Sequence, residues 1–365
     1  MAGNIENTES RHATERPLVS VVINNYNYGR FIGDAIDSAL NQTYSNVEVI
    51  VVDDGSTDDS REVIEGYGEK IKAVFKLNGG QASAMNRGFE AAAGELIYFL
   101  DSDDIALPDC VEKFINYYNA TAENSAALQF KLQIIDGDGN LTGGITPDLE
   151  RLQGGEAVRL LEQKGSYVHP PTSGNVFSRS LLEKIMPIPE KDYRICADLH
   201  LCTLAALVGT VTDIEDVLAQ YRIHGANHCA ISEDEKDRSP VKNYVAAMID
   251  ESSARSRQKK ICADYFHRPI GGNTDLLYLI FKSTGQKLFG DYNSSGAKSL
   301  KMAKRFLSDL KRDASSVPSR NKLAAAVYLM SVALLPRPVV YKLVERLFVR
   351  PPKSFELILK KSFGR

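Results

Sequence analysis

The stretch from Leu18 to Ser56, "LVSVVINNYNYGRFIGDAIDSALNQTYSNVEVIVVDDGS", carries the pattern that decides the fold. Residues 18–23 form an apolar run that predicts a strand, and residues 31–42 have the apolar spacing of a helix. Residues 47–56 form a second apolar run that ends in acidic and turn-forming residues. The stretch therefore predicts a strand, a helix and a second strand in succession.

The same alternation continues beyond Ser56. The further segments are a helix at 58–67, a strand at 71–76, a helix at 81–93 and a strand at 95–104. Strands that alternate with helices favour an α/β fold with a mostly parallel central sheet and helices on both faces. The continuous apolar runs at 49–52 and 96–100 fit strands that are buried on both sides.

Later parts of the chain divide it into three predicted regions. The pattern indicates a helix at 109–120, a strand and hairpin at 127–140, and a helix at 197–209. Past Asn227 the sequence is charged and compatible with helices, with little strand signal. We predict a flexible N-terminal tail at 1–17, an α/β domain at 18–235 and a helical C-terminal region at 236–365.

Composition and charge exclude some functional classes. The chain has 365 residues, of which 43% are hydrophobic and 25% charged, as in globular proteins. A formal net charge of -3 gives no support for nucleic-acid binding, which relies on dense positive charge. The five cysteines are odd in number and contain no CxxC pair, which argues against a disulfide framework and a zinc site and favours a reducing, cytoplasmic compartment.

Three polar clusters follow three of the predicted strands: "NNYNYG" from Asn24, "DDGSTDD" from Asp53 and "DSDD" from Asp101. Ligands of such sheets bind beyond the carboxyl ends of the strands, so we expect the clusters to converge on one site. In the second cluster, residues 56–59 fit an ordinary turn into a helix. Asp53 and Asp54 are left over, and this motif alone does not separate a turn from a binding site.

The third cluster predicts a metal site. Side chains alternate along an extended segment, so Asp101 and Asp103 face the same way. Two carboxylates on one side suit Mg²⁺ or Mn²⁺, which proteins often bind through one or two carboxylates and substrate phosphates. A solvated acidic loop is the alternative, and the buried strand in front of the motif favours the metal.

Four motifs in this order and spacing, "VSVVINNYN", "VEVIVVDDGSTD", "NGGQASAMNRG" and "IYFLDSDD", resemble the donor-binding half of a family-two glycosyltransferase. The resemblance covers about Leu18 to Asn227. It implies the GT-A nucleotide-diphospho-sugar transferase fold, followed here by the helical C-terminal region. It also implies an inverting enzyme of bacterial polysaccharide or lipid-linked glycan synthesis, with a nucleoside-diphosphate-sugar donor, most often UDP, and a divalent metal, Mn²⁺ or Mg²⁺.

The resemblance assigns roles to individual residues at the donor end. Asn24 to Tyr26 would flank the base and ribose, and Asp53 would contact the base. In the metal motif (DXD), Asp101 would lie toward the ribose and metal-bound waters, and Asp103 toward the ion that bridges the diphosphate. A bound cation would stabilise the charge that develops on the leaving diphosphate.

The sequence also departs from the family pattern. Asn24 and Asn25 replace the common Pro-Thr or Pro-Cys pair, and Met85 stands where many members have an Arg that helps to hold the nucleotide. Arg87, two residues further on, is a candidate substitute. These departures leave the identity of the base open.

The remaining candidates come from later segments. In "RICADLHLCTLAALVG" the family's general base corresponds to Asp198, although a residue there can also simply favour the start of a helix. The segment "YRIHGANH" resembles the family's Tyr-Arg-x-His run, so Arg222 could pair with phosphate and His224 could complete the metal shell. His169 falls in a loop that lines the acceptor side in the family.

The end of the chain and the acceptor are less defined by the sequence. Residues 321–365 carry nine Lys or Arg against two Glu and mix them with apolar residues at helical spacing. Such a basic amphipathic region can lie on an anionic membrane surface, which would make the protein peripheral on the inner face of the cell membrane, or it can pack on protein. A saccharide or lipid-linked acceptor is expected. Whether the chain forms a homo-oligomer is left open.

Two other functions compete with sugar transfer. One is a nucleotide-sugar-binding module without catalysis, and only the general-base role of Asp198 argues against it. A haloacid-dehalogenase-type phosphatase also uses a strand followed by Asp-x-Asp, with the first Asp as nucleophile. Those enzymes usually carry the motif on their first strand, whereas here two strand-helix units precede it, and "DDGST" has no role in that scheme.

Overall fold

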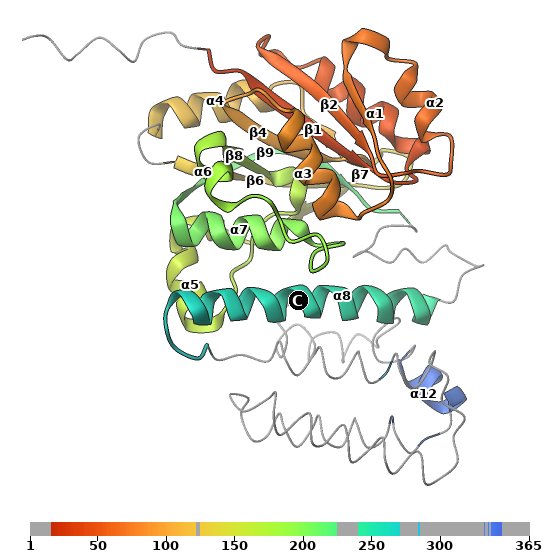
Figure 1. The fold of residues 1–365 in the computed structure, drawn as a ribbon, viewed down its shortest axis with the longest axis vertical. Helices are drawn as coiled ribbons and strands as arrows, with labels where there is room; N and C mark the ends of the chain where they lie inside the picture. Colours follow the sequence, from red (N-terminus) through yellow and green to blue (C-terminus); the bar gives the residue numbers. More distant parts are fainter. Residues whose placement is uncertain are drawn as a thin grey trace, which may run out of the picture.

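The structure is a computed structural model that describes residues 16–121, 125–224 and 240–270, together with residues 284, 332, 335 and 337–344. Nearly all of the predicted tail at 1–17 and the predicted boundary near 235 lie outside the described residues, as does most of the basic end at 321–365. Figure 1 shows the described strands and helices α1 to α7 as one α/β body, with α8 running alongside it.

A nine-stranded sheet forms the centre of the α/β body, in the order β3-β2-β1-β4-β8-β6-β9-β5, with β7 paired to β6. The strands are β1 (Val19–Asn25), β2 (Val47–Asp53), β3 (Lys72–Phe75), β4 (Leu96–Asp101), β5 (Ile105–Ala106), β6 (Ser125–Ile135), β7 (Leu141–Thr146), β8 (Asn175–Ser178) and β9 (Thr210–Arg222). Strand β1 pairs in parallel with β2 and with β4, and β2 pairs in parallel with β3. The predicted strands from Leu18 to Asp104 and their parallel arrangement are confirmed.

The other half of the sheet is mixed. Strand β8 runs antiparallel to both β4 and β6, and β9 runs parallel to β6. The predicted hairpin is β6 with β7, and its turn is closed by the N–H of Asp136, which donates to the carbonyl of Asn140 at 2.9 Å. Strand β9, by contrast, was not predicted from the sequence. Its carboxylates Asp213, Glu215 and Asp216 interrupt the apolar alternation, and its register against β6 shifts repeatedly.

Helices cover both faces of the sheet, as predicted. The described α-helices are α1 (Gly29–Leu40), α2 (Ser60–Glu65), α3 (Gln81–Ala91), α4 (Cys110–Thr121), α5 (Ala157–Lys164), α6 (Arg179–Ile185) and α7 (Ala197–Val208), followed by α8 (Pro240–Tyr265) and α12 (Arg337–Val344), which lie away from the sheet. Alternate residues of β1 enter two different buried clusters, since Val21 packs with α1 and α4 whereas Val22 packs with α3 and α7. This alternation follows from the period of two along a strand.

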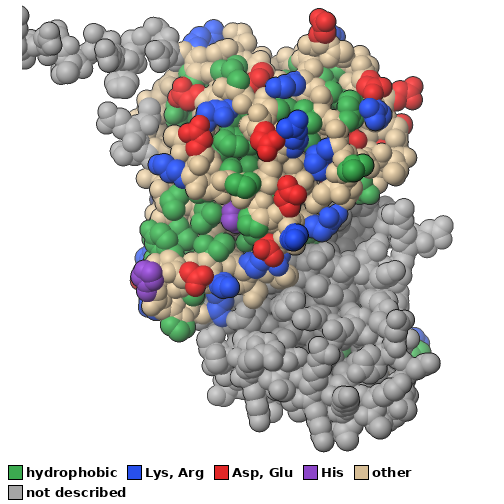
Figure 2. All heavy atoms as spheres, in the orientation of Figure 1, with side chains coloured by type: hydrophobic (Ala, Val, Ile, Leu, Met, Phe, Trp, Pro, Cys, Tyr) green, Lys and Arg blue, Asp and Glu red, His purple; other side chains and the backbone are tan. Residues whose placement is uncertain are grey.

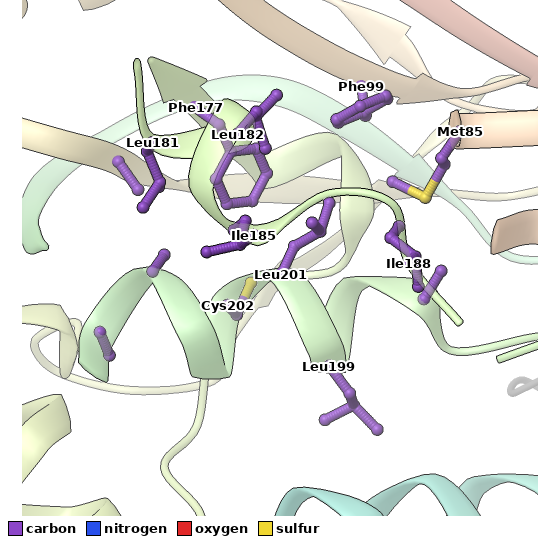
Figure 3. Packing of buried hydrophobic residues seen from close by; sticks show 14 of the residues in the cluster. Met85, Phe99, Phe177, Leu181, Leu182, Ile185, Ile188, Leu199, Leu201 and Cys202 are labelled. Carbon is purple, nitrogen blue, oxygen red and sulfur yellow. The ribbon is translucent and has the colours of Figure 1, made fainter. Parts of the chain in front are cut away.

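The cluster beneath the sheet fixes the position of α7. Phe99 of β4 and Phe177 of β8 face Leu201 and Cys202 of α7, with Met85 of α3 beside them (Figure 3). Burying side chains of this size contributes about 1.5–3 kcal/mol each to folding. Helix α7 is therefore held firmly against the sheet, and its first turn has a defined place next to the carboxyl ends of the strands.

Helix α8, from the predicted C-terminal region, packs on the α/β body. Its residues Ala254 and Cys262 are buried in the same cluster as α7. The amide of Gln258 donates to Thr203 Oγ1 of α7 at 2.7 Å. Over the described part of the chain, no helix is both long enough and apolar enough to cross a membrane. On the face drawn in Figure 2, acidic and basic side chains of the described residues are interspersed.

Candidate functional site

The carboxyl ends of β1, β2 and β4 lie next to one another. In the parallel register Asn24 pairs with Asp101, and Asn25 pairs with Asp53. A cleft of about 1100 Å³ opens beyond these ends. The three polar clusters predicted to converge are thus adjacent in the sheet, and residues of all three line the cleft.

Of the predicted site residues, the structure brings five into the lining of this cleft: Asn24, Tyr26, Asp101, Asp103 and Asp198. His169 lines it as well. Four others do not contribute to the described lining: Asp53, Arg87, Arg222 and His224.

Asn24 lines the cleft with a buried side-chain amide that has no bond to the described protein. Its side chain is only 9% exposed, yet neither Nδ2 nor Oδ1 has a hydrogen-bond partner in the described structure. A buried amide without partners costs free energy, and most such groups are bonded. A ligand in the cleft that both accepts and donates a hydrogen bond would satisfy it.

Asp53 and Asp54, which a simple turn did not account for in the sequence, both have bonds within the protein. Asp53 accepts from Asn25 Nδ2 at 2.9 Å and from the backbone N–H of Ser56 at 3.1 Å, so it braces its own turn. Asp54 pairs with Lys76 and accepts from the N–H of Gly80 at 2.7 Å. Of the two, it is Asp54 that lines the cleft.

Asp101 lies in a partly buried position with other carboxylates nearby. Its backbone N–H donates to Ser173 Oγ at 3.0 Å, and its carboxylate interacts with Thr172 and Gln81. Burial raises the pKa of this carboxyl and the charges of Asp103 and Asp198 add to the effect, so that the pKa is about 8. A cation beside the carboxylate would offset both effects.

Asp103 faces His224, whose Nε2 lies 3.1 Å from Asp103 Oδ2. The imidazole packs against Tyr28 and Phe31, with ring centroids 5.3 and 4.5 Å away. Among residues that the structure describes, no three His, Cys, Asp or Glu side chains are grouped so that they could hold a metal ion. Asp101 and Asp103 both line the cleft, and two carboxylates with substrate phosphates are a usual way to bind Mg²⁺ or Mn²⁺.

Arg222 is buried and makes its bonds to other parts of the protein. It is 2% exposed, its Nε donates to the backbone carbonyl of Asp103 at 2.8 Å, and its Nη2 donates to Asp34 at 2.8 Å. These bonds connect the end of β9 to the turn from Asp101 to Asp104 and to α1. Arg222 therefore supports the shape of the Asp101 to Asp104 turn from behind the cleft.

Asp104, the last carboxylate of the motif, is fully buried and also supports this turn. It accepts from Ser173 Oγ at 2.6 Å and from the backbone N–H of Arg222 at 2.9 Å. Burial raises its pKa well above the usual value, and Asp103 and Asp101 add to the effect. These bonds join the segment after β4 to the turn before β8 and to the end of β9.

Replacing Asp104 with alanine should lower the free energy of unfolding by about 3 kcal/mol, because two buried donors lose their acceptor. Urea unfolding of the variant measures this loss. The exposed Asp109→Ala, five residues away, serves as control and should change stability by less than about 1 kcal/mol. Equal stability of the Asp104 variant and the wild type would contradict the structural role.

Asp198 lies in the first turn of α7. The helix begins after Cys196, which has a left-handed backbone (φ 57°), and the N–H of Ala197 donates to Gln81 Oε1 at 2.9 Å. Within the described structure no hydrogen bond or ion pair engages the carboxylate of Asp198, and it does not cap the helix. A carboxylate with unused lone pairs that faces the cleft is able to accept a proton.

His169 has a fixed ring orientation. Its Nδ1–H donates to the backbone carbonyl of Pro170 at 2.8 Å, which leaves Nε2 as an acceptor. Burial lowers its pKa, while the charge of Asp198 opposes this and the charge of Arg255 adds to it. Asp198 and Arg255 thus both influence the charge state of His169, and all three residues line the cleft.

The cationic residues of the cleft were not identified from the sequence. Arg87 lies on the outer side of α3, where it is exposed and pairs with Glu90 at 2.8 Å. Arg194 and Arg255 line the cleft instead. Arg194 donates to Asn78 Oδ1 at 2.6 Å and to the carbonyl of Gly79 at 3.2 Å, contacts over more than 110 residues of chain that no local pattern reveals.

Gly80 allows this contact between distant segments. It has φ +91°, and a Cβ atom there would lie 2.7 Å from the carbonyl oxygen of Arg194. Gly80→Ala should therefore destabilise the protein by about 1–3 kcal/mol and weaken binding in the cleft. Thermal unfolding measures the effect, with Gly68→Ala as the control, since Gly68 also has positive φ (+57°) but open space around it. Equal effects of the two substitutions would show that the contact with Arg194 is unimportant.

Part of the chain is similar to known glycosyltransferase sequences. Residues 20–186 match the sequence model of the family described as Glycosyl transferase family 2. An uncharacterized glycosyltransferase of Nostoc sp. (strain PCC 7120) is 39% identical over 214 residues, which are 58% of this chain and 66% of the relative. One of Rickettsia typhi is 32% identical over 213 residues, again 58% and 66% of the two chains. The chain thus spans just under two thirds of the length of these relatives.

Comparison with solved structures concerns the fold alone. The crystal structure of S. aureus TarS 1–349 in complex with UDP superimposes with a TM-score of 0.50 at 16% identity, over 89% of this chain and 90% of that one. The same protein in complex with UDP-GlcNAc gives a TM-score of 0.51 at 18% identity, over the same shares of the two chains.

Proposed function

We propose that the protein transfers a sugar from a nucleoside diphosphate sugar to an acceptor hydroxyl, with inversion at the sugar, as supported by the match of residues 20–186 to the family 2 glycosyltransferase model and by the GT-A fold. The observation that carries the proposal is the cleft itself. It places the unpartnered amide of Asn24 and the carboxylates of Asp101 and Asp103 in the same space as Asp198. UDP is the proposed nucleotide, supported by the complexes of TarS with UDP and UDP-GlcNAc.

The donor binds at the ends of β1, β2 and β4. Asn24 and Tyr26 contact the base and ribose, and Asp101 and Asp103 face the diphosphate. A divalent cation, Mn²⁺ or Mg²⁺, held by Asp101 and Asp103 would neutralise the charge that the diphosphate gains as the sugar leaves. The burial of Asp101 and the negative charges near it support this assignment, since both disfavour an ionised carboxylate that has no cation beside it.

Asp198 serves as the general base in this proposal. An inverting transfer requires a group that removes the proton from the acceptor hydroxyl as its oxygen attacks the sugar. The carboxylate of Asp198 lines the same cleft as Asp101 and lies near enough to raise its pKa. The acceptor hydroxyl would lie between Asp198 and the donor sugar.

The biological setting belongs to the proposal as well. We propose a saccharide or lipid-linked acceptor in cell-surface polysaccharide or glycolipid synthesis, and a cytoplasmic protein that binds the membrane surface through its basic C-terminal end. The charge and apolar spacing of residues 321–365 support this binding.

Nucleotide release from sugar nucleotides tests the activity. The purified chain is incubated with UDP-glucose, UDP-GlcNAc, GDP-mannose or dTDP-glucose and Mn²⁺, and the free nucleoside diphosphate is measured. Slow release from UDP-sugars by transfer to water, stopped by EDTA, is the expected result. Binding without release would favour the non-catalytic module, and release of inorganic phosphate from sugar phosphates would favour a phosphatase.

A further inference from the structure

The cleft is larger than one ligand requires. Its volume of about 1100 Å³ exceeds the range of about 300–1,000 Å³ that is usual for small-molecule sites. Most of its lining comes from two groups of elements. The ends of β1, β2 and β4 form one group, and residues 146–149 and 168–172 with helices α7 and α8 form the other.

Helix α8 brings a charged pair to the second group. Glu251 and Arg255 are one helical turn apart, and Arg255 Nε donates to Glu251 Oε1 at 3.0 Å. Both residues line the cleft, with side-chain exposures of 13% and 36%. They lie outside residues 20–186, so the family match says nothing about them.

The pair is held in a fixed position. The neighbouring residue Ala254 is fully buried, and Gln258, one turn further on, bonds to Thr203 of α7. The guanidinium of Arg257 donates to the backbone carbonyl of Asp192. These contacts fix the backbone of α8 that carries the pair. A ligand therefore has to restrict only the two side chains, which limits the loss of conformational entropy on binding.

Arg255 has unused donors. Its Nε is bonded to Glu251, but its Nη1 and Nη2 have no hydrogen bond to any residue described by the structure. A partly exposed pair one turn apart on a helix contributes little to stability. The position of the guanidinium in the cleft is therefore explained better by a ligand than by folding.

The chemistry of the lining points to an uncharged ligand with hydroxyl groups. In the second group, the carboxylates of Asp148, Asp198 and Glu251 outnumber the guanidinium of Arg255, which disfavours an anion at this end of the cleft. In the same lining, His169 Nε2 offers an acceptor, and the 41% exposed Val168 offers an apolar surface. Donors, acceptors and an apolar patch together suit a sugar ring.

We propose that Arg255, oriented by Glu251, binds hydroxyl groups of a neutral saccharide acceptor and positions it in front of Asp198. The inference rests on the proposed function and gives the acceptor end a recognition element from α8. Arg255 is a positioning residue in this scheme, so it should affect saccharide binding without affecting the nucleotide.

Saturation-transfer NMR tests the proposal with four probes: the methyl glycosides of glucose, galactose, mannose and N-acetylglucosamine. The wild-type chain with UDP and Mg²⁺, which unlike Mn²⁺ does not broaden NMR signals, should give signals from at least one probe. Arg255→Gln should weaken the binding of that probe about tenfold, as expected for the loss of a charged hydrogen bond, and Glu251→Gln should weaken it less. Lys260→Gln, an exposed charge on the same helix, is the matched control and should have no effect.

Calorimetric titration of UDP into the same samples separates the possible failures. UDP binding without any saccharide signal from the wild type, or equal signals from wild type and Arg255→Gln, would overturn the acceptor site but leave the proposed function intact. Absence of UDP binding would count against the proposed function itself. Stronger signals from glucose 6-phosphate than from methyl glucoside would overturn the neutral ligand. Equal thermal unfolding of the variants shows that folding is not the cause.

Discussion

Asp198→Asn should lower the rate of sugar transfer by about 10²- to 10⁴-fold and leave nucleotide affinity unchanged, which is the expected effect of removing a general base. Asparagine keeps the size and shape of the side chain but cannot take the proton of an acceptor hydroxyl at neutral pH. The carboxylate has no hydrogen bond to described residues, so the fold should not change. Release of nucleoside diphosphate from a UDP-sugar, measured in single-turnover mode, gives the rate.

The matched control for Asp198 is Asp216→Asn, which removes an exposed carboxylate from β9 away from the cleft. Its transfer rate should equal that of the wild type. A wild-type rate in the Asp198 variant would remove this residue from catalysis. A parallel loss of UDP binding would instead place Asp198 in donor binding.

Asp103→Asn should weaken nucleotide binding in the presence of Mn²⁺ by about 100-fold, or about 3 kcal/mol, and should abolish its dependence on the metal. The carboxylate lines the cleft and lies beside Asp101, whereas the bond from Arg222 goes to its backbone carbonyl and survives the substitution. EDTA should weaken UDP binding by the wild type to the level of the variant. Isothermal titration with UDP measures all of these affinities.

The control for Asp103 is Asp138→Asn, an exposed carboxylate that pairs with Arg30 at 2.8 Å outside the cleft. It should bind UDP and Mn²⁺ like the wild type. Equal UDP binding by the Asp103 variant and the wild type, with the same response to EDTA, would contradict a cation at Asp101 and Asp103.

The sequence predicts the first half of the fold well because each element there has its own local signal. Buried strands such as β1 and β4 are continuous apolar runs, and the helices between them have a clear apolar face. Strand β9 has no such signal, because it is only partly buried and carries carboxylates. It is recognised only through its pairing with β6, which no local pattern encodes.

The candidate site was predictable where it depends on strand ends. Asn24, Asp101 and Asp103 were expected to come together since parallel strands end at one edge, and they all line the cleft. The sequence could not predict that Asp104 supports the turn after β4 or that Arg255 lines the cleft. Both depend on contacts between segments far apart in the chain, such as the bond between Asp104 and Arg222.

The proposed function requires that the cleft binds a nucleoside diphosphate together with a divalent cation at Asp101 and Asp103. Calorimetric titration of UDP, GDP, dTDP and CMP into the purified chain, each with and without Mn²⁺, tests it most directly. UDP should bind tightly only in the presence of Mn²⁺, and the Asp103 variant should lose this binding. Binding of none of the four nucleotides, or UDP binding of equal strength without the metal, would contradict it.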